Sequence, residues 1–416
     1  MKSDFNAMTL ERRRNLRLNL MVKYVLGMCL LVLSFFMVYH NVYDAQYSDV
    51  RSHIIFAMNL NRKNILWQYL TGNDKLWHTL LRIVYKLPGL SKKESACIVT
   101  SMVYTSYYFI GCAIMERELD LPGGVGPAGC FAVSIVSSIW APWYSSKIYL
   151  TSGSPNPWHS PTQIMVKPFA LLVFTMTAAI YNRLRTADGG WSSTAYKSKR
   201  EAAVYTLLIT FSVWAKPSFY QVIVPGLGIL MVIDLVRSRG KSFLFDLKMV
   251  GAFVPGAALT VMMFVSSFFG EGKGEGGGIQ IAPFAVWGNY SPNIPFSLLL
   301  LLAFPLFVYI MDRRSYLKTS EYPLTVTLLL SGATMRALLA EKGHRMMHGN
   351  FSWGFGLAVT LTWYVAMKRF CRLMTGDELD EREYRIAAVG GYSLLTLHLL
   401  SGIIYIYRIA SSVAQC

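Results

Sequence analysis

A basic segment, Glu11-Arg12-Arg13-Arg14-Asn15-Leu16-Arg17, stands directly before an apolar run over residues 22–39. A run of this length can cross the hydrocarbon core of a bilayer, which needs about 20 residues of helix. No small-x-small cleavage pattern follows the run, so we interpret it as a retained first membrane-spanning helix and not as a signal peptide. The basic segment then predicts that residues 1–21 lie in the cytoplasm.

Apolar runs of similar length recur along the whole chain. Its 416 residues are 53% hydrophobic and only 15% charged, whereas soluble domains usually carry about 25% charged residues. The sequence therefore predicts an all-α fold, a polytopic transmembrane helical bundle with about eleven spans in a single domain over residues 1–416. The pair at 201–236 is expected as two short helices broken at Lys216-Pro217, because proline interrupts a helix. The expected spans are 22–40, 95–115, 124–144, 164–182, 201–214, 219–236, 249–269, 294–311, 322–340, 351–368 and 387–408.

The basic residues indicate both orientation and partners. The formal charge is +17, and most Lys and Arg residues stand beside the apolar runs. With the expected spans, the basic N-terminus and the segments 183–200, 237–248, 313–318 and 368–385 share one side, which the positive-inside rule makes cytoplasmic. This distribution favours membrane lipids or an anionic lipid-linked substrate as partners, and no nucleic acid.

The first outside loop, residues 41–93, is an exception because it carries several basic residues. Within it, residues 76–87 alternate apolar and polar side chains at helical spacing. We expect an amphipathic helix that lies in the membrane interface. Long outside segments are known to escape the charge rule.

Three polar clusters stand on the outer side. The first is Tyr47-Ser48-Asp49-Val50-Arg51-Ser52-His53, in which Asp49 and His53 share a face if the segment is helical. An acidic side chain this close to the membrane can act as a general base towards a hydroxyl. The alternative is that Ser48 or Asp49 only caps the next helix.

The second cluster is Ser152-Gly153-Ser154-Pro155-Asn156-Pro157-Trp158-His159-Ser160-Pro161-Thr162, followed by Lys167. Trp158 could stack on a sugar ring or could simply anchor the chain at the interface. His159 and Lys167 could bind phosphate oxygens. A lysine one turn inside an apolar segment is costly unless it pairs or reaches the interface.

The third cluster covers residues 341–353. If it is helical, Glu341, Arg345 and His348 fall on one face, and the planar Arg345 guanidinium suits phosphate. The alternative is a Glu341–Arg345 surface pair worth under about 1 kcal/mol. Arg336, just upstream, lies inside an apolar run, where ionisable residues are candidates for function.

The joint position of the clusters predicts one outer pocket rich in cations and poor in acids, which suits a lipid phosphate or diphosphate. None of the six cysteines forms a CxxC pair, so no thiolate metal site is expected. The candidate catalytic residue is Asp49. The candidate substrate-binding residues are His53, Asn156, Trp158, His159, Lys167, Glu341, Arg345, His348, Asn350 and Trp353, and no metal ligands are assigned.

A cytoplasmic N-terminus, a first span and a long outer loop with Asp49 soon after the membrane resemble the GT-C superfamily of polytopic membrane glycosyltransferases. The resemblance implies a polyprenyl-phosphate-linked sugar donor, a glycan or lipid acceptor and an essential acid or base at Asp49. The family often has two adjacent acids there, whereas this chain has Ser48-Asp49 with Asp44 upstream. No cofactor is indicated, and the use of a divalent metal stays open. The stretches 156–162 and 341–353 resemble loops of uncharacterised bacterial relatives, so we expect a bacterial plasma membrane.

Three functions follow as hypotheses. The first is an inverting sugar transfer with Asp49 as the base. The second is a polysaccharide polymerase or O-antigen-ligase-like enzyme with a diphosphate-linked donor, in which Arg345 and His348 would matter more than Asp49. The third is a lipid or glycan transporter or flippase, for which polar groups near the membrane midplane are expected. For that third hypothesis the candidates are Lys216, Asp234 and Arg336.

Overall fold

The computed structural model describes residues 10–42, 48–60, 75–184, 190–269, 278–315 and 319–411, and nearly all of its regular structure is helical. The long helices are α2 (Leu10–Asn41), α6 (Lys92–Glu118), α9 (Pro161–Tyr181), α10 (Lys199–Ala215), α11 (Ser218–Arg237), α12 (Phe243–Phe269), α14 (Ile294–Met311), α15 (Glu321–Leu338), α16 (Ser352–Thr375) and α17 (Glu381–Ala410). The short elements are α3 (Val50–Met58), α5 (Lys75–Tyr85), α7 (Val125–Ile135), α8 (Tyr149–Ser152), α13 (Ala285–Tyr290), η1 (Arg313–Ser315), η2 (Gly343–His348) and the strands β1 (Ile279–Ile281) and β2 (Leu339–Glu341).

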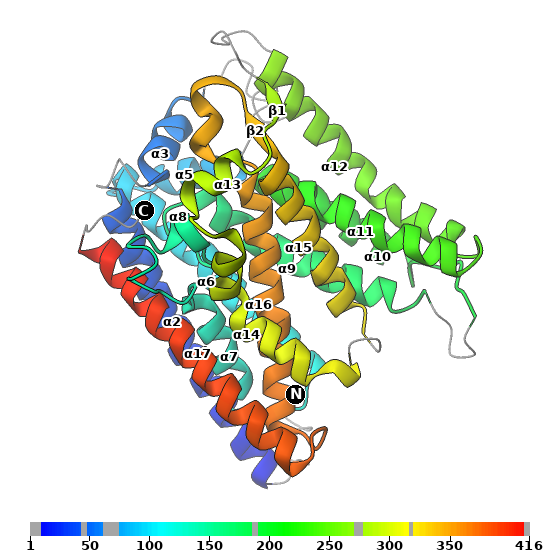
Figure 1. Cartoon of the computed structure of the whole chain (residues 1–416). Coiled ribbons are helices and arrows are strands. Elements are labelled where there is room, and N and C mark those ends of the chain that lie inside the picture. Colours follow the sequence, from blue (N-terminus) through cyan, green and yellow to red (C-terminus); the bar gives the residue numbers. More distant parts are fainter. Residues whose placement is uncertain are drawn as a thin grey trace.

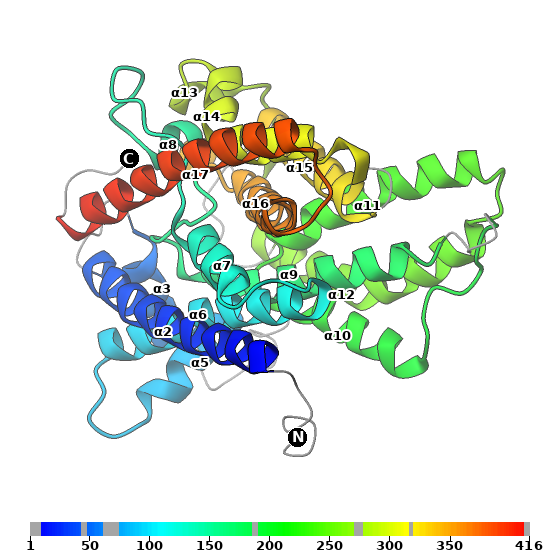
Figure 2. The same cartoon turned by 90° about the horizontal axis from the view of Figure 1, so that it is seen from below.

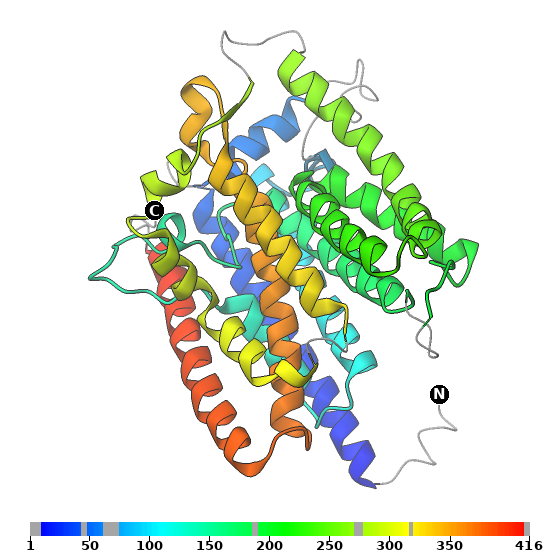
Figure 3. The same ribbon diagram turned by 45° about the vertical axis from the view of Figure 1, so that its right-hand side comes forward.

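Within the described residues, seven helices are long and apolar enough to cross a membrane, namely α2, α6, α9, α11, α12, α14 and α17. The chain is therefore a multi-pass helical membrane protein, as the sequence predicts. Helices α10, α15 and α16 coincide with the expected segments 201–214, 322–340 and 351–368, but they are not among these seven, so the expected total of about eleven spans stays a prediction. Helix α16 lies in the middle of the bundle, where α7, α9, α11, α14, α15 and α17 pack around it (Figure 2). Helix α12 packs on α10 and α11 at one side of the bundle (Figure 3), and these two helices join it to the rest through α9, α15 and α16.

The expected span at 124–144 is wrong in its second half, because α7 ends at Ile135. Beyond it, the chain is not helical, and other elements satisfy its backbone. Ser137 N donates to His398 O (3.2 Å), Ile139 N to Leu300 O (2.9 Å) and Trp140 N to the Ser401 hydroxyl (2.9 Å). Irregular backbone at membrane depth is tolerated where protein surrounds it in this way.

Two other expectations about the helices are confirmed. The break at Lys216-Pro217 separates α10 from α11, and Pro217 stands immediately before the first turn of α11. The segment at 76–87 forms the helix α5, which buries Trp77 and Leu81, while its expected position in the membrane interface stays a prediction. The first outer loop also includes residues 43–47 and 61–74, which lie outside the described residues.

The basic segments share one end of the bundle, as the charge pattern predicts. Arg314 pairs with Glu383 (2.9 Å), Asn182 accepts a hydrogen bond from Ser320 N (2.9 Å), and Lys248 donates to Ser193 O (2.9 Å). The N-terminal segment joins them at the end of α6, where Asn19 donates to Glu116 (2.8 Å) and Lys368 pairs with Glu118. Figure 1 shows α3, α13 and the β1–β2 pair at the opposite end from the start of α2.

Buried cations at the basic end have carboxylate partners. Lys368 pairs with Glu118 (2.7 Å) and with Glu321. Arg369 donates to both Asp312 oxygens, and its Nη2–Oδ1 distance is 3.0 Å. Burying an unpaired charge costs free energy. The carboxylate partners therefore allow Lys368 and Arg369 to lie on α16 at the centre of the bundle.

Candidate functional site

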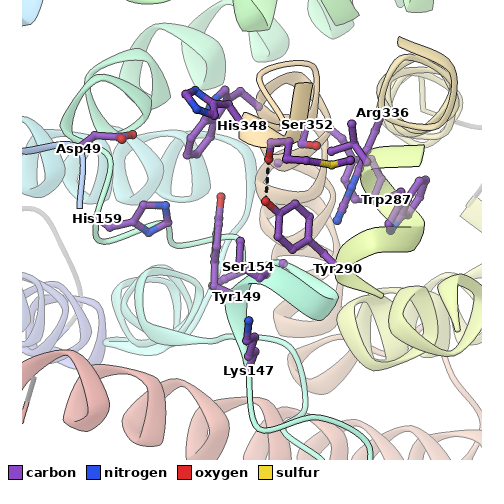
Figure 4. Close-up of a pocket in the computed structure, with 18 of the residues that line it drawn as sticks. Asp49, Lys147, Tyr149, Ser154, His159, Trp287, Tyr290, Arg336, His348 and Ser352 are labelled. Carbon is purple, nitrogen blue, oxygen red and sulfur yellow. Dashed lines mark hydrogen bonds between the residues drawn. The ribbon is translucent and has the colours of Figure 1, made fainter. Parts of the chain in front are cut away.

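A cavity of about 840 Å³ lies at the end of the bundle opposite the basic segments. Its walls come from the start of α3, the segment 146–159 with α8, the helices α13 and α15, the turn η2, and the ends of α16 and α17. Figure 4 shows Asp49 and His159 on one wall, Arg336 and Trp287 on the opposite wall, and Lys147 at the edge between them. Three regions far apart in sequence therefore meet in one hollow, as the joint position of the polar clusters predicts.

Asp49 sits at the start of α3, and its main chain is tied to the second cluster. Asp49 N donates to His159 O (3.1 Å), and the Ser48 hydroxyl donates to the same oxygen (3.4 Å). The capping bond is made by Ser48, whose Oγ accepts from Val50 N (3.2 Å), while the Asp49 side chain makes no cap bond. Among the described lining residues, Asp49 supplies the only carboxylate.

His159 lies beside Asp49 with only 7% of its surface exposed. Burial lowers the pKa of His159 to about 4, with a further lowering from Lys216 that the nearby Asp49 opposes. The imidazole is therefore neutral at neutral pH, so it does not supply the cationic contact that we expect from the sequence. Its ring packs against Tyr149, at 4.4 Å between centroids, and against Trp353, at 5.9 Å.

Arg336 forms the opposite wall, where its side chain is 9% exposed. The guanidinium lies over the Trp287 ring (4.4 Å from its centroid) and near the Phe355 ring (5.3 Å). Nε has no hydrogen-bond partner, and no carboxylate of the described residues pairs with this cation. Two more cations line the cavity rim, the exposed Lys147 and the half-buried Arg408, which donates to Ser146 O.

Aromatic side chains line the cavity between these two walls. Tyr149, Trp353 and Tyr290 line the cavity along with Trp287 and Phe355. The Tyr290 hydroxyl donates to Met347 O (2.6 Å) and so joins α13 to η2 across the cavity (Figure 4). Flat aromatic side chains with polar edges suit the face of a sugar ring. In this cavity such a ring would lie between the two walls, whose polar groups can bind its ends.

Among the expected site residues, the structure brings Asp49, His159, His348 and Trp353 to the cavity lining. His53 does not line it. Instead, its Nδ1 lies 3.0 Å from Nε2 of His78 on α5. Burial lowers the pKa of His53 well below its usual value, and His78, Lys216 and Lys75 add to this effect.

Three residues of the second cluster are buried beneath the cavity and hold the fold together. The Asn156 amide donates to Val133 O (2.9 Å) and Val136 O (2.8 Å), which closes the end of α7. Lys167 donates to Pro155 O (2.7 Å) and to Asn156 Oδ1 (2.9 Å). The Trp158 ring packs on Tyr104, with 4.8 Å between centroids. None of the three lines the cavity, so their expected contact with substrate gains no support.

The third cluster does not form the α-helix that would place Glu341, Arg345 and His348 on one face. Glu341 ends strand β2, which pairs with β1, and only Gly343–His348 then forms a short 3-10 turn. Glu341 pairs with Arg345 (3.4 Å) and accepts from Asn350 (2.7 Å), which is the surface-pair alternative. Arg345 is 53% exposed and does not line the cavity, whereas His348 does.

The cavity also contains residues that the sequence clusters do not include, namely Lys147, Tyr149, Trp287, Tyr290 and Arg408. Proximity to the second cluster along the chain could have indicated Lys147 and Tyr149, whereas Trp287 stands far from all three clusters in the sequence. Arg336 carries a clearer signal, because it is a charged residue inside an apolar run. In the described part of the chain, no group of three or more His, Cys, Asp or Glu side chains is placed to hold a metal ion.

Comparison with known proteins adds no assignment to this geometry. No protein-family model matches the chain, and no curated protein matches it significantly. The chemistry of the cavity therefore rests on its own residues: one carboxylate on one wall, a buried guanidinium on the other, and aromatic rings between them.

Proposed function

We propose that the protein is a membrane glycosyltransferase that moves a sugar from a polyprenyl-phosphate-linked donor to a hydroxyl of a glycan or lipid acceptor. The observation that supports this most directly is the charge arrangement of the cavity. Asp49 is the only carboxylate among its described lining residues, and it faces the Arg336 wall across a hollow lined with aromatic rings. A base and an anion site on opposite sides of a sugar are what an inverting displacement requires.

In the proposed step, the acceptor oxygen attacks the anomeric carbon of the donor while Asp49 takes the hydroxyl proton. The bond between the anomeric carbon and the phosphate oxygen breaks, and its electron pair leaves with the polyprenyl phosphate. Arg336, assisted from the rim by Lys147 and Arg408, stabilises the negative charge that grows on the leaving phosphate. Attack and departure on opposite faces invert the anomeric configuration.

The test is a transfer assay in proteoliposomes with a panel of radiolabelled polyprenyl-phosphate sugars and a glycan extract as acceptor. Asp49→Asn keeps the shape of the side chain and removes the base, so transfer should fall by about 10²- to 10⁴-fold. Asp120→Asn is the matched control, because Asp120 is exposed and does not line the cavity. Near-normal transfer by a folded Asp49→Asn protein would reject Asp49 as the base.

A second candidate is a polymerase or ligase with a diphosphate-linked donor. It is favoured by the number of cations at the cavity, where Lys147, Arg336 and Arg408 accompany His348. In such an enzyme His348→Ala should reduce turnover more than Asp49→Asn. Measuring both variants with monophosphate-linked and diphosphate-linked donors separates the two functions.

The proposal also includes an orientation. We place the basic end of the bundle in the cytoplasm and the cavity on the outer face of a bacterial plasma membrane. Helices α10, α15 and α16 and the short α7 then complete the expected total of about eleven spans. Helices α3 and α5 lie in the outer interface in this arrangement, next to the membrane lipids.

A further inference from the structure

Among the described residues of the bundle, the two most deeply buried arginines are Arg336 and Arg369. Both belong to helices that pack at its centre, and they are 9% and 4% exposed. Arg369 donates to Asp312 and also approaches Glu378 (3.4 Å). Arg336 has no carboxylate partner among the described residues, and its Nε has no hydrogen-bond partner. A buried cation without a carboxylate partner destabilises a folded protein, and a bound anion would offset this cost at Arg336.

The surroundings of Arg336 limit how that anion can bind. Trp287 and Phe355 pack on the guanidinium, at 4.4 Å and 5.3 Å from their ring centroids. A guanidinium carries its N–H donors in its plane, so packing on its faces does not use them, although Nε itself is enclosed. Arg336 lines the cavity, and Figure 4 shows the side chain directed into it from the wall that carries Trp287. A planar fork presented in this way matches the oxygen atoms of a phosphate.

The rest of the lining indicates which kind of phosphate fits. Lys147 and Arg408 add positive charge at the rim, which favours a dianion such as a phosphate monoester over a single carboxylate. Leu150, Leu301 and Val359 line the same cavity and offer apolar surface next to the cations. A charged head with a hydrocarbon chain attached would use both kinds of surface, whereas inorganic phosphate would use only the first.

We propose that Arg336, held by Trp287 and Phe355, is a preformed binding site for the phosphate monoester head of an isoprenoid lipid. The choice of an isoprenoid rests on the proposed function, whereas the phosphate site itself rests on the unpaired guanidinium. The site binds the lipid phosphate that remains after sugar transfer, so it holds this ligand without any reaction.

The experiment measures thermal unfolding of the purified full chain in detergent with three additives: citronellyl phosphate, citronellol and inorganic phosphate. A ligand that binds only the folded state raises the melting temperature. Citronellyl phosphate should stabilise the wild-type protein, citronellol should not, and inorganic phosphate should act only at much higher concentration. Equal stabilisation by inorganic phosphate and citronellyl phosphate would overturn the lipid part of the assignment.

Variants then test the role of Arg336. Arg336→Met should weaken citronellyl phosphate binding by about 10- to 100-fold, and Arg336→Lys should weaken it as well, because lysine lacks the planar fork. Without ligand, Arg336→Met should be at least as stable as the wild-type protein, since an unpaired buried charge is removed. The buried counterpart Arg369→Met should be less stable but should keep the ligand response. Arg314→Met, an exposed change at the basic end, should leave both properties unchanged.

If Arg336→Met responds to citronellyl phosphate as the wild-type protein does, the proposed site is overturned. It is also overturned if Arg336→Met without ligand loses as much stability as Arg369→Met, because Arg336 would then be a structural residue. Asp49→Asn keeps the two proposals apart. It should retain citronellyl phosphate binding even though transfer is lost. If binding depends on Arg336 but no sugar is ever transferred, the phosphate site stands and the proposed glycosyltransferase activity fails.

Discussion

The His159 imidazole is enclosed by Tyr149 and Trp353 and lies next to Asp49. Burial lowers the pKa of His159 to about 4, against about 6.5 in an unfolded chain. Between these two values the unfolded chain binds more protons than the folded protein does. The free energy of unfolding is therefore highest above pH 6.5 and decreases as the pH falls towards 4, by up to about 3 kcal/mol from this group.

This pH dependence can be measured by thermal unfolding between pH 7.5 and pH 4.5. His159→Gln should unfold at a temperature that falls less steeply with decreasing pH than that of the wild-type protein. Burial also lowers the pKa of His53, so His53→Gln should remove a separate part of the slope and the double variant should be the least sensitive. An unchanged slope in all three variants would show that neither imidazole is buried in its neutral form.

Residue types alone identify candidate groups but not their surroundings. The sequence predicts a common pocket for Asp49, His159 and His348, and all three line the cavity, because each stands beside a turn at the same end of the bundle. Asn156 and Lys167 have the same polar character but bind backbone carbonyls beneath the cavity. Asn156 lies beneath the cavity because the carbonyl groups at the end of α7 need hydrogen-bond donors. Local sequence does not show which side chain supplies these donors.

At the level of elements, the extended segment after α7 packs against α17 at very short range. A Cβ atom added to Gly402 would lie 2.1 Å from Ile135 O, the last residue of α7. Close by, the Ser401 hydroxyl accepts from Trp140 N, and His398 Nδ1 lies 2.6 Å from Ser137 O. The small side chains of α17 therefore let a non-helical segment pass inside the bundle with its backbone satisfied.

Gly402→Ala should therefore destabilise the protein by about 1–3 kcal/mol, because the new methyl group cannot fit without moving the backbone of α7 or α17. The measurement is the melting temperature of the purified variant in detergent. Gly228→Ala on α11 is the matched control, because a Cβ there meets no atom within 4 Å and alanine favours the helix. Equal melting temperatures for the two variants would contradict the close packing.

Helices were easier to predict than the points where they end. Long apolar runs determine α2, α6, α9 and α14, because only a helix satisfies its own backbone in lipid. The expected span at 124–144 looked the same in sequence, yet its second half is held by partners from α14 and α17. The β1–β2 pairing likewise depends on a contact between residues 279–281 and 339–341, which no local pattern indicates.

Across the whole molecule, buried cations at the two ends differ in their pairing. Lys368 and Arg369 have carboxylates at the basic end, whereas Arg336 at the cavity end has none among the described residues. The count of Lys and Arg residues predicts which loops share an end, since membrane insertion acts on loop charge. It does not predict pairing, which depends on how α6, α14 and α15 pack around α16.

The proposed orientation of the whole bundle in the membrane predicts which residues can be labelled from outside the cell. A lipid-linked donor outside the cytoplasm requires the cavity on the outer face and the η1 segment inside. Ser146 is exposed at the cavity rim and Arg314 is exposed at the basic end. A membrane-impermeant maleimide should therefore label Ser146→Cys in intact cells, and Arg314→Cys only after the cells are opened. The background for both variants, and the blank, is the Cys416→Ser chain, because Cys416 lies outside the described residues. The remaining cysteines are buried except for Cys29, which lies within the apolar part of α2. The reverse labelling pattern would put the cavity in the cytoplasm, where the proposed orientation and outer-face transfer both fail.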